Sequence, residues 1–133
     1  MEIKKTIRVV LVDDHPMIRR GIRSILEKSS NICVIGEAGT GVAGIHLVRQ
    51  LKPDVLLLDV ELPDMKGYQV ARELRMSHSS VCILMLSACD DDHFIKEMLR
   101  MGADACLSKG ESPEKIRQTV YRVSKKIPVP VLV

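Results

Sequence analysis

Three carboxylates, one hydroxyl and one ammonium group follow apolar runs that are typical of buried strands. The residues are Asp13, Asp14, Asp59, Ser87 and Lys109. In an open parallel sheet, the carboxyl ends of the strands line one crevice, where ligands bind. We therefore expect these side chains, which come from four separate segments of the chain, to meet at one site.

Such a set of groups is suited to phosphoryl transfer. Neighbouring carboxylates repel one another and are stabilised by a divalent cation, and oxygen ligands favour Mg²⁺, Mn²⁺ or Ca²⁺ over zinc. Mg²⁺ is the preferred ion where a phosphate shares its coordination sphere, and Mn²⁺ can replace it. A carboxylate nucleophile forms an aspartyl-phosphate, while a lysine and the cation neutralise the transferred group. A single aspartate after a strand is usually a turn or cap residue. The hypothesis of phosphoryl transfer therefore depends on the occurrence of all these polar residues at successive strand ends.

Strand-like and helix-like patterns alternate five times along the chain, which predicts an α/β fold with a parallel sheet. The expected strands are 7–12, 32–37, 55–58, 81–86 and 105–107. The expected helices are 16–28, 40–52, 68–76, 93–101 and 112–123. Thr40 and Ser112 are expected helix N-caps, and Gly102 is expected to end the fourth helix.

The composition indicates one domain with an aliphatic core. The 133 residues are 46% apolar and only 2% aromatic, as suits a parallel sheet buried on both faces. A net charge of +3 with 28% charged residues gives no strong bias toward nucleic acid. Neither a signal region nor an apolar run of transmembrane length is found, so we expect a cytoplasmic protein without a membrane partner.

The cysteines lack the spacing of a zinc site or a Cys-x-x-Cys pair. Cys33, Cys82 and Cys106 fall in or beside apolar strands, where cysteine behaves as a small hydrophobic residue. We predict that these three are reduced core residues.

Across residues 7–124 the sequence resembles the receiver domain of two-component response regulators. The matching stretches are 10–15, 57–67, 85–88 and 102–109. The resemblance implies a flavodoxin-like (βα)5 fold, a doubly wound parallel sheet with strand order 2-1-3-4-5. It also implies that Asp59 is the phosphoacceptor and that Lys109 and Ser87 contact the phosphoryl group. The implied Mg²⁺ ligands are Asp13, Asp14, Asp59 and the backbone carbonyl of Val60.

The resemblance also assigns residues to switching and to dephosphorylation. Ser87 and Cys106 occupy the switch positions, but the family usually has Tyr or Phe where this chain has Cys106. Cysteine is too small to fill and vacate the space of a ring, so we expect weaker coupling, or coupling through the loop after Ser87 and the fourth helix. Glu61 and Cys89 lie two residues after Asp59 and Ser87, at positions that tune the access of water to the acyl phosphate.

A protein of this family is a phosphorylation-dependent switch rather than a conventional enzyme, because it catalyses its own phosphorylation and dephosphorylation. The implied partners are a sensor histidine kinase and, after phosphorylation, a second copy of the chain. Pro16 and the Lys109-Gly110 junction resemble receivers of the LuxR/NarL type, which precede helix-turn-helix domains. We therefore expect 1–124 to be the receiver domain and 125–133 to be a C-terminal tail or the start of a linker. The expected output is transcription through a DNA-binding domain absent from this sequence, and a stand-alone receiver is the alternative.

Three other interpretations remain open. The chain could be a degenerate receiver that serves only as a protein-interaction module. Gly39, Gly41 and Gly44 spell a G-x-G-x-x-G dinucleotide-binding pattern, with Asp59 twenty residues after the first glycine, but this leaves the other polar strand ends unexplained. An aspartyl phosphatase of the haloacid-dehalogenase type needs Asp-x-Asp, which the Asp59-Val60-Glu61 segment breaks.

Overall fold

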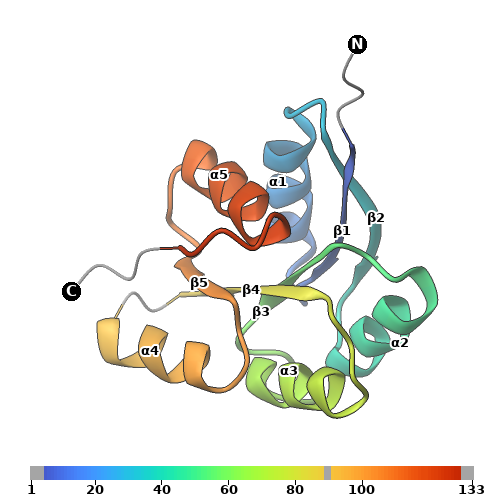
Figure 1. Cartoon of the computed structure of the whole chain (residues 1–133), viewed down its shortest axis with the longest axis vertical. Helices are drawn as coiled ribbons and strands as arrows, with labels where there is room; N and C mark the ends of the chain where they lie inside the picture. Colours follow the sequence, from blue (N-terminus) through green and yellow to red (C-terminus); the bar gives the residue numbers. More distant parts are fainter. Residues whose placement is uncertain (1–4, 89–90, 130–133) are drawn as a thin grey trace.

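A computed structural model describes residues 5–88 and 91–129 of the chain (Figure 1). Its sheet has five parallel strands in the order β2-β1-β3-β4-β5. The strands are β1 Ile7–Val12, β2 Ile32–Ala38, β3 Val55–Asp59, β4 Cys82–Ser87 and β5 Ala105–Ser108. This order confirms the predicted flavodoxin-like fold.

Five helices cover the two faces of the sheet. They are α1 Pro16–Glu27, α2 Gly41–Leu51, α3 Gly67–Met76, α4 Asp92–Arg100 and α5 Pro113–Ser124. Helices α1 and α5 contribute buried residues to one hydrophobic cluster, and α2, α3 and α4 to the other (Figure 1). The sheet therefore lies between two apolar layers, as the doubly wound prediction requires.

The central strands are apolar on both faces because both faces are covered. In β3, Leu56 and Leu58 face the α2–α4 layer, whereas Val55 and Leu57 face the α1–α5 layer. All four side chains are fully buried. Successive side chains of a strand point to opposite faces, and burial of each such side chain contributes about 1.5–3 kcal/mol. The continuous apolar runs thus place β1, β3 and β4 at the centre of the molecule.

The predicted caps position the ends of the helices. Thr40 Oγ1 accepts a hydrogen bond from the backbone N–H of Ala43 at 3.1 Å, and Ser112 Oγ accepts one from Lys115 at 3.2 Å. Gly102 follows α4 with a φ of +116°, a backbone conformation that glycine adopts without strain. These local signals help to explain why each predicted strand and helix boundary lies within one residue of the observed one.

The prediction for Cys33 is wrong. Cys82 and Cys106 are buried as expected, but Cys33 is exposed. It lies on the edge strand β2 between the buried residues Ile32 and Val34, so alternation turns its side chain away from the α1–α5 layer. An apolar neighbourhood in the sequence does not ensure a covered face at the edge of the sheet.

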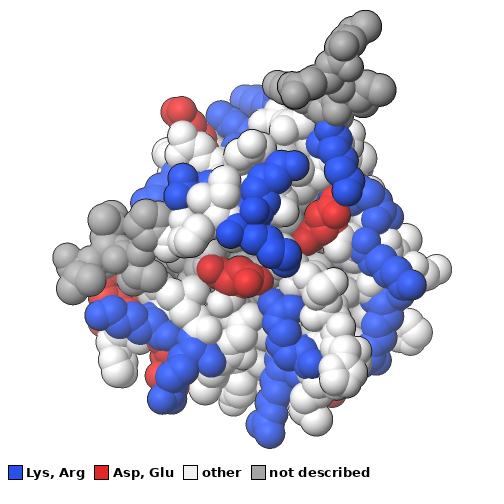
Figure 2. All heavy atoms as spheres, viewed as in Figure 1, with Lys and Arg blue, Asp and Glu red and all other residues white. Residues whose placement is uncertain are grey.

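The described surface has no dominant charged patch on the face in view. Figure 2 shows lysine and arginine side chains in several separate groups, with acidic and uncharged surface between them. Among the described residues, no helix is long and apolar enough to cross a membrane.

Candidate functional site

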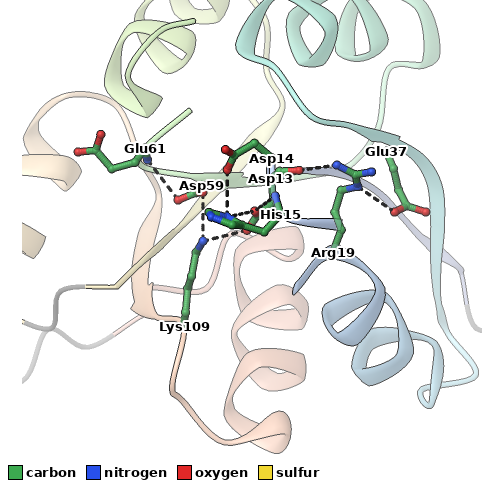
Figure 3. Close-up of polar contacts among 8 residues, drawn as sticks. All are labelled: Asp13, Asp14, His15, Arg19, Glu37, Asp59, Glu61 and Lys109. Atoms are coloured by element: carbon green, nitrogen blue, oxygen red, sulfur yellow. Dashed lines mark hydrogen bonds and ion pairs between the residues drawn. The ribbon is translucent and has the colours of Figure 1, made fainter. Parts of the chain in front are cut away.

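The predicted site residues meet at the carboxyl ends of the strands. Asp13 directly follows β1, Asp59 ends β3, Ser87 ends β4, and Lys109 directly follows β5. Lys109 Nζ lies 2.9 Å from Asp13 Oδ2 and 3.0 Å from Asp59 Oδ2 (Figure 3). The ammonium group thus joins acids that are 46 positions apart in the sequence. Their convergence confirms the expectation that these strand ends form one site.

Ser87 is fixed beside this cluster by the sheet. Its backbone carbonyl accepts a hydrogen bond from the N–H of Lys109 at 2.7 Å, and its side chain is buried. Strand β4 lies between β3 and β5, so Ser87 sits at the strand end between those of Asp59 and Lys109. The observed β4 ends at Ser87, one residue later than the predicted strand, so this serine is part of the sheet.

The site gives its two buried carboxyl groups opposite pKa shifts. Burial raises the pKa of Asp59, and the nearby charge of Asp13 adds to this, outweighing Lys109 and the backbone N–H of Glu61. Burial also opposes the charged form of Asp13, but the N–H of His15 and the Lys109 ammonium group outweigh it and lower the pKa of Asp13. Different hydrogen bonding therefore distinguishes two acids in the same crevice.

Lys109 remains a cation at this site. Its burial disfavours the ammonium form, but the Asp13 and Asp59 carboxylates outweigh this effect and raise the pKa of Lys109. A partly buried positive charge held beside Asp59 can stabilise an anionic group that reaches the same carboxylate.

The cluster has the donors for a divalent cation. Ligand-capable atoms of Asp13, Asp14, His15 and Asp59 all lie within 4.8 Å of one another. Three carboxylate oxygens of the cluster are buried: Asp13 Oδ2 and Asp59 Oδ2 contact Lys109 Nζ, and Asp14 Oδ1 contacts the His15 ring. A carboxylate oxygen held by one nitrogen still has a lone pair for an oxygen-coordinated ion such as Mg²⁺.

His15 is a neighbour to which the sequence patterns assigned no role. Its Nδ1 lies 3.1 Å from Asp13 Oδ1 and 3.0 Å from Asp14 Oδ1 (Figure 3). Its backbone N–H also donates to Asp13 Oδ1 at 2.8 Å. His15 therefore holds the two adjacent acids close together at the start of α1.

The backbone after Asp59 forms a tight turn. The N–H of Glu61 donates to Asp59 Oδ1 at 3.2 Å, and the carbonyl of Val60 accepts a hydrogen bond from Gly67 at 2.7 Å. A Cβ atom on Gly67 would lie 2.9 Å from the Asp59 carbonyl oxygen, so glycine permits this close approach. The backbone carbonyl of Val60, which is a predicted Mg²⁺ ligand, thus already accepts a hydrogen bond from the first residue of α3.

Glu61 directs its carboxylate away from Asp59. Figure 3 shows the side chain extending outward, and Glu61 Oε2 lies 2.6 Å from Lys66 Nζ. Cys89, the other predicted tuning residue, lies outside the described residues. Cys106 is buried against the α2–α4 layer, opposite Met85 in the sheet register.

The glycine-rich turn before α2 is occupied by a carboxylate of the chain itself. Asp64 Oδ1 accepts from the N–H of Gly41 at 2.8 Å, and Asp64 Oδ2 accepts from Val42 at 3.0 Å. These hydrogen bonds lower the pKa of Asp64. A dinucleotide phosphate would need the same helix N-terminus. The geometry therefore disfavours the dinucleotide interpretation.

Close packing accounts for the two later glycines of this motif. A Cβ atom on Gly44 would lie 2.7 Å from Val12, and one on Gly41 would lie 2.3 Å from Met65. Both glycines therefore bring α2 close to its neighbours, and neither needs a ligand to explain it.

The family comparison agrees with this geometry. Residues 9–121 match the model of the response regulator receiver domain. The chain belongs to that family.

Relatives of this receiver domain include longer bacterial response regulators. It is 34% identical over 116 residues to the nitrate/nitrite response regulator protein NarL of Escherichia coli, covering 87% of this chain and 54% of that protein. It is also 34% identical over 117 residues to the response regulator GacA of Pseudomonas viridiflava, covering 88% of this chain and 55% of that protein. The receiver domain thus spans little more than half the length of these relatives.

Solved structures support the same family. The signal receiver domain of the NarL response regulator from Mycobacterium tuberculosis superposes with a TM-score of 0.87 at 36% identity, covering 91% of this chain and 98% of that chain. A LuxR-family response regulator from Aurantimonas gives a TM-score of 0.89 at 26% identity, covering 96% of this chain and 91% of that chain. The fold and the LuxR/NarL-type resemblance expected from the sequence are therefore confirmed.

Proposed function

We propose that this receiver domain is a phosphorylation-controlled switch in which Asp59 accepts a phosphoryl group from a sensor histidine kinase. The observation that carries the proposal is a buried Asp59 carboxylate held 3.0 Å from the Lys109 ammonium group, within a cluster of acids that can hold a cation. In the reaction, a carboxylate oxygen of Asp59 bonds to phosphorus as the phosphorus–nitrogen bond of phosphohistidine breaks. The other ring nitrogen of the phosphohistidine carries a proton, so the kinase histidine leaves as a neutral imidazole and needs no proton from this chain.

The acids of the cluster would hold Mg²⁺, which when bound supplies charge neutralisation for the transferred group. Asp13, Asp14 and Asp59 are the proposed side-chain ligands, and Mn²⁺ is the expected substitute. The Val60 carbonyl has one lone pair engaged by Gly67, so an ion would share that oxygen or take the next carbonyl of the turn, that of Glu61.

Lys109 and Ser87 would contact the phosphoryl oxygens. Lys109 contributes a fixed positive charge, and Ser87 contributes a hydroxyl donor at the end of the neighbouring strand. Because Cys106 replaces the usual aromatic residue, we propose that the signal passes mainly through the loop after Ser87 and through α4. Glu61 and Cys89 are proposed to tune dephosphorylation, and in the described structure Lys66 holds the Glu61 carboxylate outward.

The output would be control of transcription, because a relative from Bacillus subtilis that is 36% identical over 122 residues is named a transcriptional regulatory protein. In this proposal phosphorylation shifts a two-state equilibrium toward a homodimer, and DNA is bound by a domain outside this sequence. The end of α5 at Ser124 supports the division into a receiver domain at 1–124 and a linker or tail at 125–133.

Acetyl phosphate with Mg²⁺, followed by intact-mass measurement, tests the phosphoacceptor. We expect a gain of one phosphoryl group in the unsubstituted protein and none in Asp59→Asn or without Mg²⁺. Absence of the gain, together with no response to beryllofluoride, would instead support the degenerate receiver. A beryllofluoride response without a mass gain would point to rapid dephosphorylation.

A further inference from the structure

Arg19 connects helix α1 to the backbone of the acidic cluster. Its Nη1 donates to the carbonyl oxygen of Asp13 at 2.7 Å, a short, charge-assisted hydrogen bond. Its Nε lies 3.4 Å from Glu37 Oε1 on β2 (Figure 3). The guanidinium group is thus held between the edge strand and the turn that carries the two adjacent acids.

The contact with Arg19 acts on both acids at once. The carbonyl of Asp13 and the N–H of Asp14 belong to one planar peptide group, so fixing the carbonyl also fixes the direction of the chain at Asp14. The N–H of Asp13 donates to the carbonyl of Ala38 at 3.0 Å. The backbone of Asp13 is therefore held by β2 on one side and by Arg19 on the other.

Asp14 depends on this backbone more than Asp13 does. The Asp13 side chain is buried and touches both Lys109 and His15, whereas one third of the Asp14 side chain is exposed, and it contacts the His15 ring. A shift of the peptide group would therefore move the Asp14 carboxylate away from the other acids.

Gly39 provides the space for Arg19. A Cβ atom at Gly39 would lie 3.3 Å from Arg19 Nη1, close enough to push the guanidinium group by a few tenths of an ångström. The first glycine of the G-x-G-x-x-G pattern is thus explained by an internal arginine.

We propose that Arg19 is a positioning residue for the Mg²⁺ site, which it preorganises through the Asp13–Asp14 peptide group. This inference rests on the Mg²⁺ binding of the proposed function. It predicts that loss of the Arg19 contact weakens the binding of Mg²⁺, even though Arg19 itself does not touch the ion.

Arg23 offers a matched control on the same helix. It pairs with the same Glu37, and with Glu27, instead of with the Asp13 carbonyl. Arg19→Ala and Arg23→Ala therefore each remove one guanidinium partner of Glu37, but only the first removes the contact to the acidic turn.

The test is a titration of each protein with MgCl₂ alone, in which the amide chemical shifts in NMR spectra measure binding. A urea unfolding curve for each variant checks that it is folded. We expect Arg19→Ala to weaken Mg²⁺ binding about 10-fold, the usual scale for residues that orient metal ligands, and Arg23→Ala to change it less than about 2-fold. Arg19→Lys and Gly39→Ala, which keep the positive charge, should give intermediate affinities.

The outcomes separate this inference from the proposed function. Equal Mg²⁺ affinities for Arg19→Ala and Arg23→Ala, in an unsubstituted protein that binds Mg²⁺, overturn the role of Arg19 alone. No saturable Mg²⁺ response in the unsubstituted protein overturns both. If Arg19→Ala does not fold, unchanged affinity in both Arg19→Lys and Gly39→Ala overturns the role of Arg19.

Discussion

At the scale of single residues, different hydrogen bonding gives two buried aspartates of the site opposite pKa shifts. Asp13 gains the N–H of His15 and the Lys109 ammonium group, so its pKa falls, whereas burial dominates at Asp59 and its pKa rises. An acid with a raised pKa is one whose charged form the fold disfavours. Asp59 is therefore a destabilised anion, which suits the proposed roles of this residue as a cation ligand and as the phosphoacceptor.

The raised pKa of Asp59 has a consequence for stability. Below the pKa of an unfolded aspartate, about 3.9, Asp59 is neutral in both the folded and the unfolded protein and does not lower the free energy of unfolding. As pH rises from that value through the higher folded pKa, the unfolded protein ionises more readily than the folded one, and the free energy of unfolding falls. Without Mg²⁺, Asp59→Asn should therefore raise the free energy of unfolding at pH 7 and lose this advantage near pH 3. Urea unfolding at the two pH values measures it, and an equal difference at both would contradict the assignment.

At the scale of elements, glycines decide how closely helices approach the sheet. Gly21 and Gly44 both lie inside helices, where alanine is normally the better residue by about 1 kcal/mol. A Cβ atom at Gly21 would meet nothing within 4 Å, but one at Gly44 would lie 2.7 Å from Val12 on β1. The two positions look alike in the sequence and differ in the folded chain.

These two glycines give opposite expected outcomes for one substitution. Gly21→Ala should stabilise the protein by about 0.5–1 kcal/mol, because it lowers the entropy of the unfolded chain without a clash. Gly44→Ala should destabilise it by about 1–3 kcal/mol through overpacking against β1. Thermal or urea unfolding of both variants checks the contrast, and effects of the same sign would contradict the packing of α2.

At the scale of the whole molecule, the two covered faces of the sheet determine which thiols can react. Cys82 and Cys106 lie in separate hydrophobic clusters on opposite faces, whereas Cys33 is exposed on the edge strand. A thiol reagent should therefore modify Cys33 in the native protein and reach Cys82 and Cys106 only after unfolding. Peptide mapping after a timed reaction measures this order. Slow labelling of Cys33, compared with the same residue in denaturant, would show that its edge of the sheet is covered.

The sequence determined the fold class and which polar residues lie at the carboxyl ends of the strands. Continuous apolar runs require a sheet covered on both faces, and parallel strands bring their carboxyl ends to one edge. Asp13, Asp59, Ser87 and Lys109 therefore had to converge once the strands were recognised. Local capping signals at Thr40, Ser112 and Gly102 likewise act within a few residues and could be read directly.

Only the tertiary structure decided the contacts between distant segments. Side-chain direction and helix spacing determine three of these features. They are the contact of Arg19 with the Asp13 carbonyl, the contact of Asp64 with the N-terminus of α2, and the outward side chain of Cys33. Periodicity in the sequence gives the face of an element on which a residue lies, but not what covers that face, because each contact arises where two separately specified elements meet. The glycine pattern shows the difference most clearly. Its sequence is typical of a phosphate-binding turn, but in the folded chain Arg19, Asp64 and Met65 occupy the space around the same turn.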